Sequence, residues 1–448
     1  MEDKPNILLI TVDSLRPDHL GYFGYDIQTS PNIDALARRG KDYRSALSHG
    51  GGTSEAFPTI LNGVLPPVDI KQCDLGLRRG ASVVKRLKEK GYTTAAFNSN
   101  PYLSRFFGYA DDFDLFFHNL KGVKERRHTV TDGGIYPLLK LITGNPPIIQ
   151  GQELVHQFKT WLATVRAPFF AWIHFMDAHM PYLPPSDFVR MITPKPANRL
   201  YMVYLYRKMY ESNRKVYQSL DPSRSTLTAE ELRKIIEYYD AGVRYVDSCV
   251  GELLDILQDK VLLEDTTIFL TADHGELLGE HGLVDHGYLY EQIIHVPLII
   301  AGRGITHEEV KEPTTHLLIP KTILDLAGID DAAIAHNIDS YANLESGIIS
   351  SVVDVNRNMY SIRTKSWHFI GTFDLITGRH LFELYNIAED PMEAVNVSDS
   401  QPELLRMFSE RVTNFIQTNS SELESPARAL SKAEEKELSR RLKELGYE

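Results

Sequence analysis

Apolar and polar positions follow two alternating patterns along the chain: short, nearly continuous apolar runs and longer amphipathic stretches. The run "PNILLITVDS" near the start is rich in β-branched residues and leucine and ends at an acid, as is typical of a strand buried on both faces. Residues 229–258 instead repeat apolar side chains at helical spacing and lead into the run "TTIFLTADHG". Such pairs recur over more than 300 residues. They predict an α/β fold with a large, mostly parallel sheet flanked by helices.

The pattern changes after about residue 345, where several short strand-like runs with turn residues between them precede the helical stretch "QPELLRMFSERVTNFIQ". We therefore expect a large α/β domain over 1–345 and a small C-terminal subdomain, an antiparallel sheet plus helices, over 346–448. The charged tail over 425–448 is expected to form a solvated end helix. The aromatic and basic region 186–228 reads as a helical insertion that packs on the large domain, or as a lid or oligomer contact.

Composition narrows the class of protein. The chain has 48 Lys and Arg against 60 Asp and Glu, a formal charge of −12, which disfavours nucleic-acid binding. Its two cysteines form neither a disulfide framework nor a metal-binding pair. The N-terminus lacks the features of a signal peptide, and no apolar run is long enough for a membrane span. We expect a cytoplasmic protein, with a homo-oligomer left open.

Polar side chains gather where the expected strands end. The candidates are Asp13, Asp177, His179, Asp273, His274 and His286, together with Thr53 on the glycine-rich loop "SHGGGTSEAFPTILNG". Ligands of parallel sheets bind outside the carboxyl ends of the strands, so these groups should converge on one edge.

The combination of Asp13, Asp273 and His274 indicates a metal site. Two carboxylates and an imidazole suit Zn²⁺ or Mn²⁺ better than Ca²⁺, and the Thr53 hydroxyl could complete the shell. A divalent ion would lower the pKa of that hydroxyl and make Thr53 a nucleophile. Thr53 could equally be a helix cap, and the two roles are compatible.

Several motifs occur in the order found in a known family. They are "PNILLITVDSLRPDHLGYFGY", "SPNIDALARRG", "HFMDAHMPYLPP", "TADHGELLGEHG" and "ELYNIAEDPMEAVN". In this order the chain, from residue 5 to about 410, resembles the sulfatase-like branch of the alkaline phosphatase superfamily. The resemblance implies hydrolysis of sulfate, phosphate or phosphonate esters through a covalent intermediate on a metal-bound nucleophile.

The resemblance also implies roles for individual residues. Asp13, Asp273 and His274 match the metal ligands, and His179 matches a histidine that contacts the substrate or leaving group. Counting back ten residues from Gly63 places Thr53 at the nucleophile position. Asn100 lies where the family often has a substrate-binding polar group, although it could be a turn residue.

The nucleophile loop departs from the sulfatase pattern Cys/Ser-x-Pro-x-Arg. Thr53 cannot be converted to formylglycine, and neither the proline nor the arginine is present. A threonine resembles the phosphodiesterase and nucleotide pyrophosphatase members instead. His286 stands where sulfatases have a lysine. Asp177, His179 and His286 could hold a second metal ion, although their spacing differs from that of the two-metal members.

The sequence therefore favours a metal-dependent hydrolase of small anionic phosphate- or sulfate-type esters that acts through a covalent intermediate on Thr53. Phosphodiesters and phosphonate esters are favoured as substrates. Three alternatives stay open: a sulfatase that works without formylglycine, a phosphoryl-group transferase, and a catalytically silent binding protein of the same fold.

Overall fold

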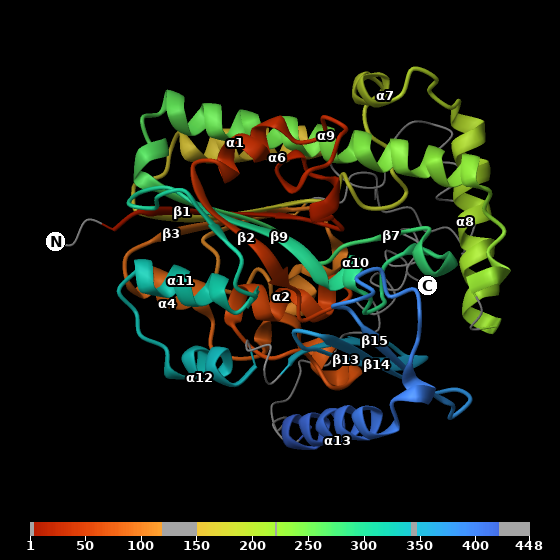
Figure 1. The fold of residues 1–448 in the computed structure, drawn as a ribbon. Helices are drawn as coiled ribbons and strands as arrows, with labels where there is room; N and C mark the ends of the chain where they lie inside the picture. The colour runs from red at the N-terminus through yellow and green to blue at the C-terminus, as the bar shows by residue number, and fades with distance from the viewer. Residues whose placement is uncertain (1–3, 119–149, 220–221, 342–346, 421–448) are drawn as a thin grey trace, which may run out of the picture.

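The computed structural model describes residues 4–118, 150–219, 222–341 and 347–420. The expected end helix over 425–448 lies outside these residues. Figure 1 shows the described chain as a helix-covered central sheet with a second, smaller sheet beside it.

The central sheet has nine strands in the described part of the chain. Their order is β10-β2-β9-β6-β1-β5-β3-β4, and β11 pairs with β2. All neighbours run parallel except β9, which is antiparallel to both β6 and β2. The mostly parallel sheet expected from the sequence is therefore confirmed. The strands are β1 (Asn6–Val12), β2 (Gly40–Leu47), β3 (Thr93–Asn98), β4 (Leu115–His118), β5 (Phe169–Phe175), β6 (Thr266–Ala272), β9 (His295–Ala301), β10 (Glu308–Val310) and β11 (Thr314–Thr315).

Helices cover both faces of this sheet (Figure 1). One face carries α1 (Pro31–Ala37), α6 (Gly151–Leu162) and α9 (Ala229–Asp259); the other carries α2 (Thr53–Asn62), α4 (Val83–Glu89) and α11 (Leu318–Leu326). The helix α9 begins at a capping box, in which the Thr228 and Glu231 side chains each bond the other's backbone N–H. With both faces covered, every side chain of β1, β5 and β6 is buried, which explains their nearly unbroken apolar sequences.

The second sheet is antiparallel and lies beside α2 (Figure 1). Its outer cover is α13 (Pro402–Asn419), which buries Phe408, Val412 and Phe415. A backbone bridge joins Gly50, in the loop before α2, to Ser351 in the first strand of this sheet. The C-terminal sheet therefore supports the loop that carries Thr53. Its strands are β12 (Ile348–Val353), β13 (Arg357–Arg363), β14 (Trp367–Asp374) and β15 (His380–Asn386).

The region 186–228 contains α7 (Ser186–Ile192) and α8 (Arg199–Ser219). The Asn213 side chain on α8 exchanges two hydrogen bonds with the backbone of Val284, at 2.6 and 3.0 Å. This attaches α8 to β8 (Val284–Asp285), which pairs with β7 (Leu277–Leu278). Among the described residues, no helix is both long and apolar enough to cross a membrane. The remaining short helices are α3 (Ile70–Leu75), α10 (Glu291–Ile294) and α12 (Ala332–Tyr341).

Candidate active site

Asp13 follows β1 directly and is completely buried. Its neighbour Ser14 has a φ of +60°, in the left-handed region that a serine rarely adopts. The Tyr239 hydroxyl on α9 fixes this turn, since it donates to the Ser14 carbonyl at 2.8 Å and accepts from the Arg16 N–H at 2.9 Å. The Ser14 hydroxyl in turn donates to Asp13 Oδ1 at 3.1 Å. The strained turn thus holds the Asp13 carboxylate in one orientation.

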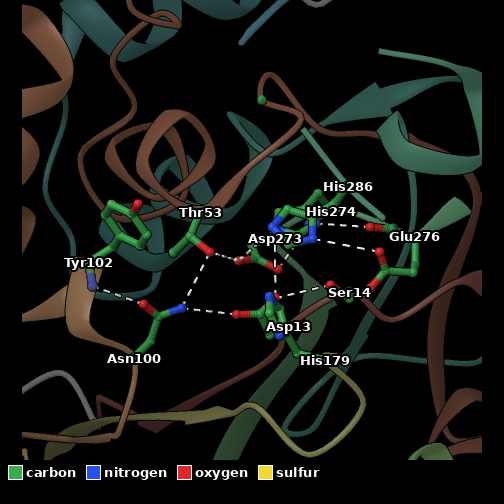
Figure 2. A network of polar contacts seen from close by, with 12 residues as sticks. Asp13, Ser14, Thr53, Asn100, Tyr102, His179, Asp273, His274, Glu276 and His286 are labelled. Carbon is green, nitrogen blue, oxygen red and sulfur yellow. Dashed lines mark hydrogen bonds and ion pairs between the residues drawn. The ribbon is translucent and has the colours of Figure 1, made fainter. Parts of the chain in front are cut away.

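Thr53 is the first residue of α2, and its hydroxyl donates to Asp273 Oδ2 at 3.0 Å (Figure 2). The neighbouring Ser54 hydroxyl donates instead to Glu55 at 2.9 Å, away from that carboxylate. The preceding glycines have a packing reason: a Cβ at Gly51 would lie 2.0 Å from the Tyr288 carbonyl oxygen. The loop therefore passes so close to its neighbours that only glycine fits, and it delivers Thr53 rather than Ser54 to the centre.

Asp13, Asp273 and His274 form one buried group with the geometry of a metal site. His274 Nε2 lies 3.7 Å from Asp13 Oδ1 and 3.6 Å from Asp273 Oδ2. These separations are too long for hydrogen bonds but close to the roughly 3–3.5 Å between two ligands of one ion at about 2.1 Å. His274 Nδ1 faces the Gly275 carbonyl at 2.9 Å, so the proton belongs on Nδ1 and Nε2 has a free lone pair for a metal. The donor set thus fits a divalent ion.

The pKa values of the two carboxyl groups also favour a bound cation. Burial alone would raise the pKa of Asp13, but His179, His174 and His274 around it hold that pKa well below its usual range. Burial and the nearby Asp13 charge raise the pKa of Asp273. Two carboxylates this close repel each other, and a divalent cation between them would remove that repulsion.

Asn100 connects Thr53 to Asp13, as Figure 2 shows. Its amide Nδ2 donates to Asp13 Oδ2 at 2.9 Å and lies 3.3 Å from Thr53 Oγ1. Its Oδ1 accepts from the Tyr102 N–H at 2.9 Å, which fixes the orientation of the amide. Asn100 is completely buried, so the structure brings it to the same centre as Thr53.

His174 was not among the candidates from the sequence, yet it contacts this centre. It is buried in β5, and its Nε2 lies 3.4 Å from Asp13 Oδ2. Its Nδ1 is 3.0 Å from the Thr11 hydroxyl, directly across the β1–β5 register. A polar imidazole in the otherwise apolar strand "FFAWIHF" was the available signal, because a buried histidine needs a polar partner.

A second polar group lies next to Asp13, Asp273 and His274, which are called the metal group below. His286 stacks on His274 with ring centroids 4.6 Å apart, and it lies 4.8 Å from His179. Its Nδ1 is 3.6 Å from Glu276 and 3.4 Å from Asp285, two acids that sequence reasoning missed. Burial would lower the pKa of His286, but these carboxylates raise it to about 10, so this imidazole is protonated at neutral pH. Glu276 follows Asp273 by three residues, and Asp285 adjoins His286, so proximity in sequence was the signal.

The structure does not bring Asp177 to either group. Among the described residues, the sets able to hold a metal omit it. Its Oδ1 accepts from the Gly151 N–H at 3.2 Å, at the start of α6. A carboxylate at a helix N-terminus is favoured by the orphan N–H groups there, which accounts for this placement. Burial raises the pKa of Asp177 to about 7.

A cavity of about 550 Å³ opens onto this centre. Its lining includes Thr53, His179 and His286, together with residues from α3, α8, the segment after β3 and the C-terminal sheet. The cavity is large enough to hold a small ester beside the Thr53 hydroxyl.

Comparison with known proteins identifies the family. The sulfatase family model matches residues 5–329. The chain is 25% identical to a choline-sulfatase of Rhizobium meliloti (strain 1021), with 89% of this chain and 83% of that protein covered. It is 28% identical to the human iduronate 2-sulfatase, over 71% of this chain and 64% of that protein.

Solved structures agree on the fold. A phosphonate monoester hydrolase of Agrobacterium radiobacter superposes with a TM-score of 0.66 at 20% identity, covering 93% of this chain and 96% of that chain. The chain belongs to the sulfatase family of hydrolases, within the alkaline phosphatase superfamily.

Proposed function

We propose that the protein is a metal-dependent hydrolase of phosphodiesters or phosphonate esters that works through a covalent intermediate on Thr53. One observation carries this proposal: of the two hydroxyls in the nucleophile loop, the one that reaches Asp273 and Asn100 belongs to a threonine. A threonine cannot supply the formylglycine on which sulfatases of the usual type depend. The described cysteines, Cys73 and Cys249, lie in α3 and α9, outside this loop.

Asp13, Asp273 and His274 would hold the metal ion, with Zn²⁺ or Mn²⁺ preferred for a mixed oxygen and nitrogen donor set. When bound, the ion supplies positive charge that stabilises negative oxygens and lowers the pKa of a neighbouring hydroxyl. Glu276, Asp285 and His286 form a second set with ligand spacing, which omits Asp177, but a metal ion there would have to displace the proton of His286.

Side chains and water account for the proton transfers. Thr53 Oγ1 forms the bond to phosphorus while the bond from phosphorus to the leaving alcohol breaks. The Thr53 hydroxyl donates to Asp273 Oδ2 in this structure; with Asp273 bound to a metal ion, the Thr53 proton would leave to water in the cavity that Thr53 lines. Asn100 Nδ2 orients both Thr53 and Asp13. The protonated His286, with His179 beside it, is placed to give a proton to the leaving alcohol. Water then breaks the bond between phosphorus and Thr53.

The second candidate is hydrolysis of sulfate esters without formylglycine. The names of the choline-sulfatase and iduronate 2-sulfatase relatives favour it. A side-by-side assay decides between the two, using 4-nitrophenyl sulfate, 4-nitrophenyl phosphate, bis(4-nitrophenyl) phosphate and 4-nitrophenyl phenylphosphonate. We expect the diester and the phosphonate to have the highest kcat/KM. Turnover of the sulfate alone would overturn the preference for phosphorus.

A further inference from the structure

The cavity beside Thr53 has several aromatic lining residues, which we call its aromatic wall. Four ring side chains line it: Tyr102 and Phe107 from the segment after β3, and Tyr206 and Tyr210 from α8. The Tyr102 and Phe107 rings are stacked, with centroids 6.1 Å apart and planes at 30°. Rings from two distant segments of the chain therefore meet around one space.

The acids that line the cavity outnumber its cations, which are Arg357 and the protonated His286. Asp74, Asp285 and Asp354 line the cavity. Among the described lining residues the only Lys or Arg is Arg357, whose Nε lies 3.5 Å from Asp354. Arg357 also donates to the Gly287 carbonyl at 2.7 Å and stacks on the Tyr288 ring at 4.6 Å. Its charge is thus already used within the protein, and the wall would repel a substrate arm that carries further negative charge.

We propose that this wall binds a positively charged ammonium group on one alcohol arm of the ester. The faces of aromatic rings attract cations, and nearby carboxylates add to that attraction. The scissile group would then lie beside Thr53, and the cationic arm would extend toward Tyr206 and Tyr210. This substrate class rests on the proposed function, because it specifies which alcohol is esterified in the substrate that Thr53 would attack.

The test compares two diesters of the same shape, 4-nitrophenyl phosphocholine and 4-nitrophenyl 3,3-dimethylbutyl phosphate, which differ only in the positive charge. Cation–π contacts contribute about 0.5–2 kcal/mol, so we expect kcat/KM to be roughly two- to thirty-fold higher for the cationic diester. Tyr206→Leu and Tyr210→Leu should reduce this ratio toward one, whereas Tyr206→Phe should keep it. Tyr204→Leu is the matched control, since Tyr204 lies on the same helix but does not line the cavity.

Equal turnover of the two diesters by the unaltered enzyme would overturn the inference and leave the proposed function standing. A ratio that survives both leucine variants would also overturn it. If neither diester is hydrolysed, the proposed function fails, and titration calorimetry with choline and 3,3-dimethylbutanol then tests the wall without catalysis. Tighter binding of choline, lost in Tyr210→Leu, is expected. Equal binding of the two alcohols would contradict the cation site.

Discussion

Replacing Asp177 with asparagine should stabilise the protein increasingly as the pH rises. Burial raises the pKa of this carboxyl from 3.8 to about 7 in the folded protein. The folded state therefore holds a proton that the unfolded state has already lost, and the wild-type protein loses stability between about pH 4 and pH 7. This rise in pKa from 3.8 to about 7 corresponds to roughly 4 kcal/mol of folding stability, all of which is lost once the pH is above 7. Asparagine carries no charge at any pH, so the variant escapes this loss.

The substitution also carries a cost that does not depend on pH. Asp177 Oδ2 is buried with no hydrogen-bond partner among the described residues. An amide NH₂ in its place would also lack a partner, which costs about 1–3 kcal/mol of folding stability. The slope with pH, rather than the absolute difference, is therefore the quantity to measure. The assay is thermal unfolding of both proteins from pH 5 to pH 8, together with ester hydrolysis at pH 7.5.

We expect the midpoint of Asp177→Asn to rise steadily relative to wild type up to about pH 7 and then level off. Activity should stay within a few-fold of wild type, because Asp177 bonds the start of α6 and not the metal group. A difference that is constant with pH would refute the buried, proton-binding carboxyl. Loss of bound metal in the variant would instead indicate that Asp177 is a metal ligand.

Three further predictions concern the centre itself. Asn100→Ala removes the donor shared by Asp13 and Thr53, so kcat/KM should fall roughly ten- to hundred-fold while the unfolding midpoint changes little; an unchanged rate would remove Asn100 from the site. Chelation of the metal should abolish hydrolysis and lower the unfolding midpoint, and added Zn²⁺ or Mn²⁺ should restore both. Full activity in a preparation that metal analysis finds to be metal-free would refute the metal site. His286→Asn should slow esters of poorly leaving alcohols roughly a hundred-fold or more but affect 4-nitrophenyl esters much less; equal losses for both would exclude His286 as the proton donor.

The sequence was sufficient for the large elements because their patterns are long. Buried parallel strands such as β1 and β6 need continuous apolar runs, and the stripe of α9 repeats over 31 residues. The antiparallel direction of β9 was not predictable, because a strand buried on both faces has the same continuous apolar pattern in a parallel or an antiparallel pair.

The clustering of candidate residues was predictable where they follow strands directly, as Asp13, Asp273 and His274 do. Position after a strand was not enough for Asp177, which turns to the N-terminus of α6 instead. His174 was missed because strand pairing with Thr11, a tertiary fact, places its ring against Asp13. A single sequence carries no record of which strands become neighbours, so such contacts need the structure.

The proposed mechanism is tested most directly by a search for the covalent intermediate on Thr53. The purified, metal-loaded enzyme would be mixed with bis(4-nitrophenyl) phosphate, quenched in acid within milliseconds to seconds, digested and analysed by mass spectrometry. We expect the peptide that contains Thr53 to gain the mass of one nitrophenyl phosphoryl group, and Thr53→Ala to show neither the adduct nor turnover. Full activity of Thr53→Ala, or an adduct on Ser54 in the wild-type enzyme, would contradict the assignment of Thr53 as the nucleophile.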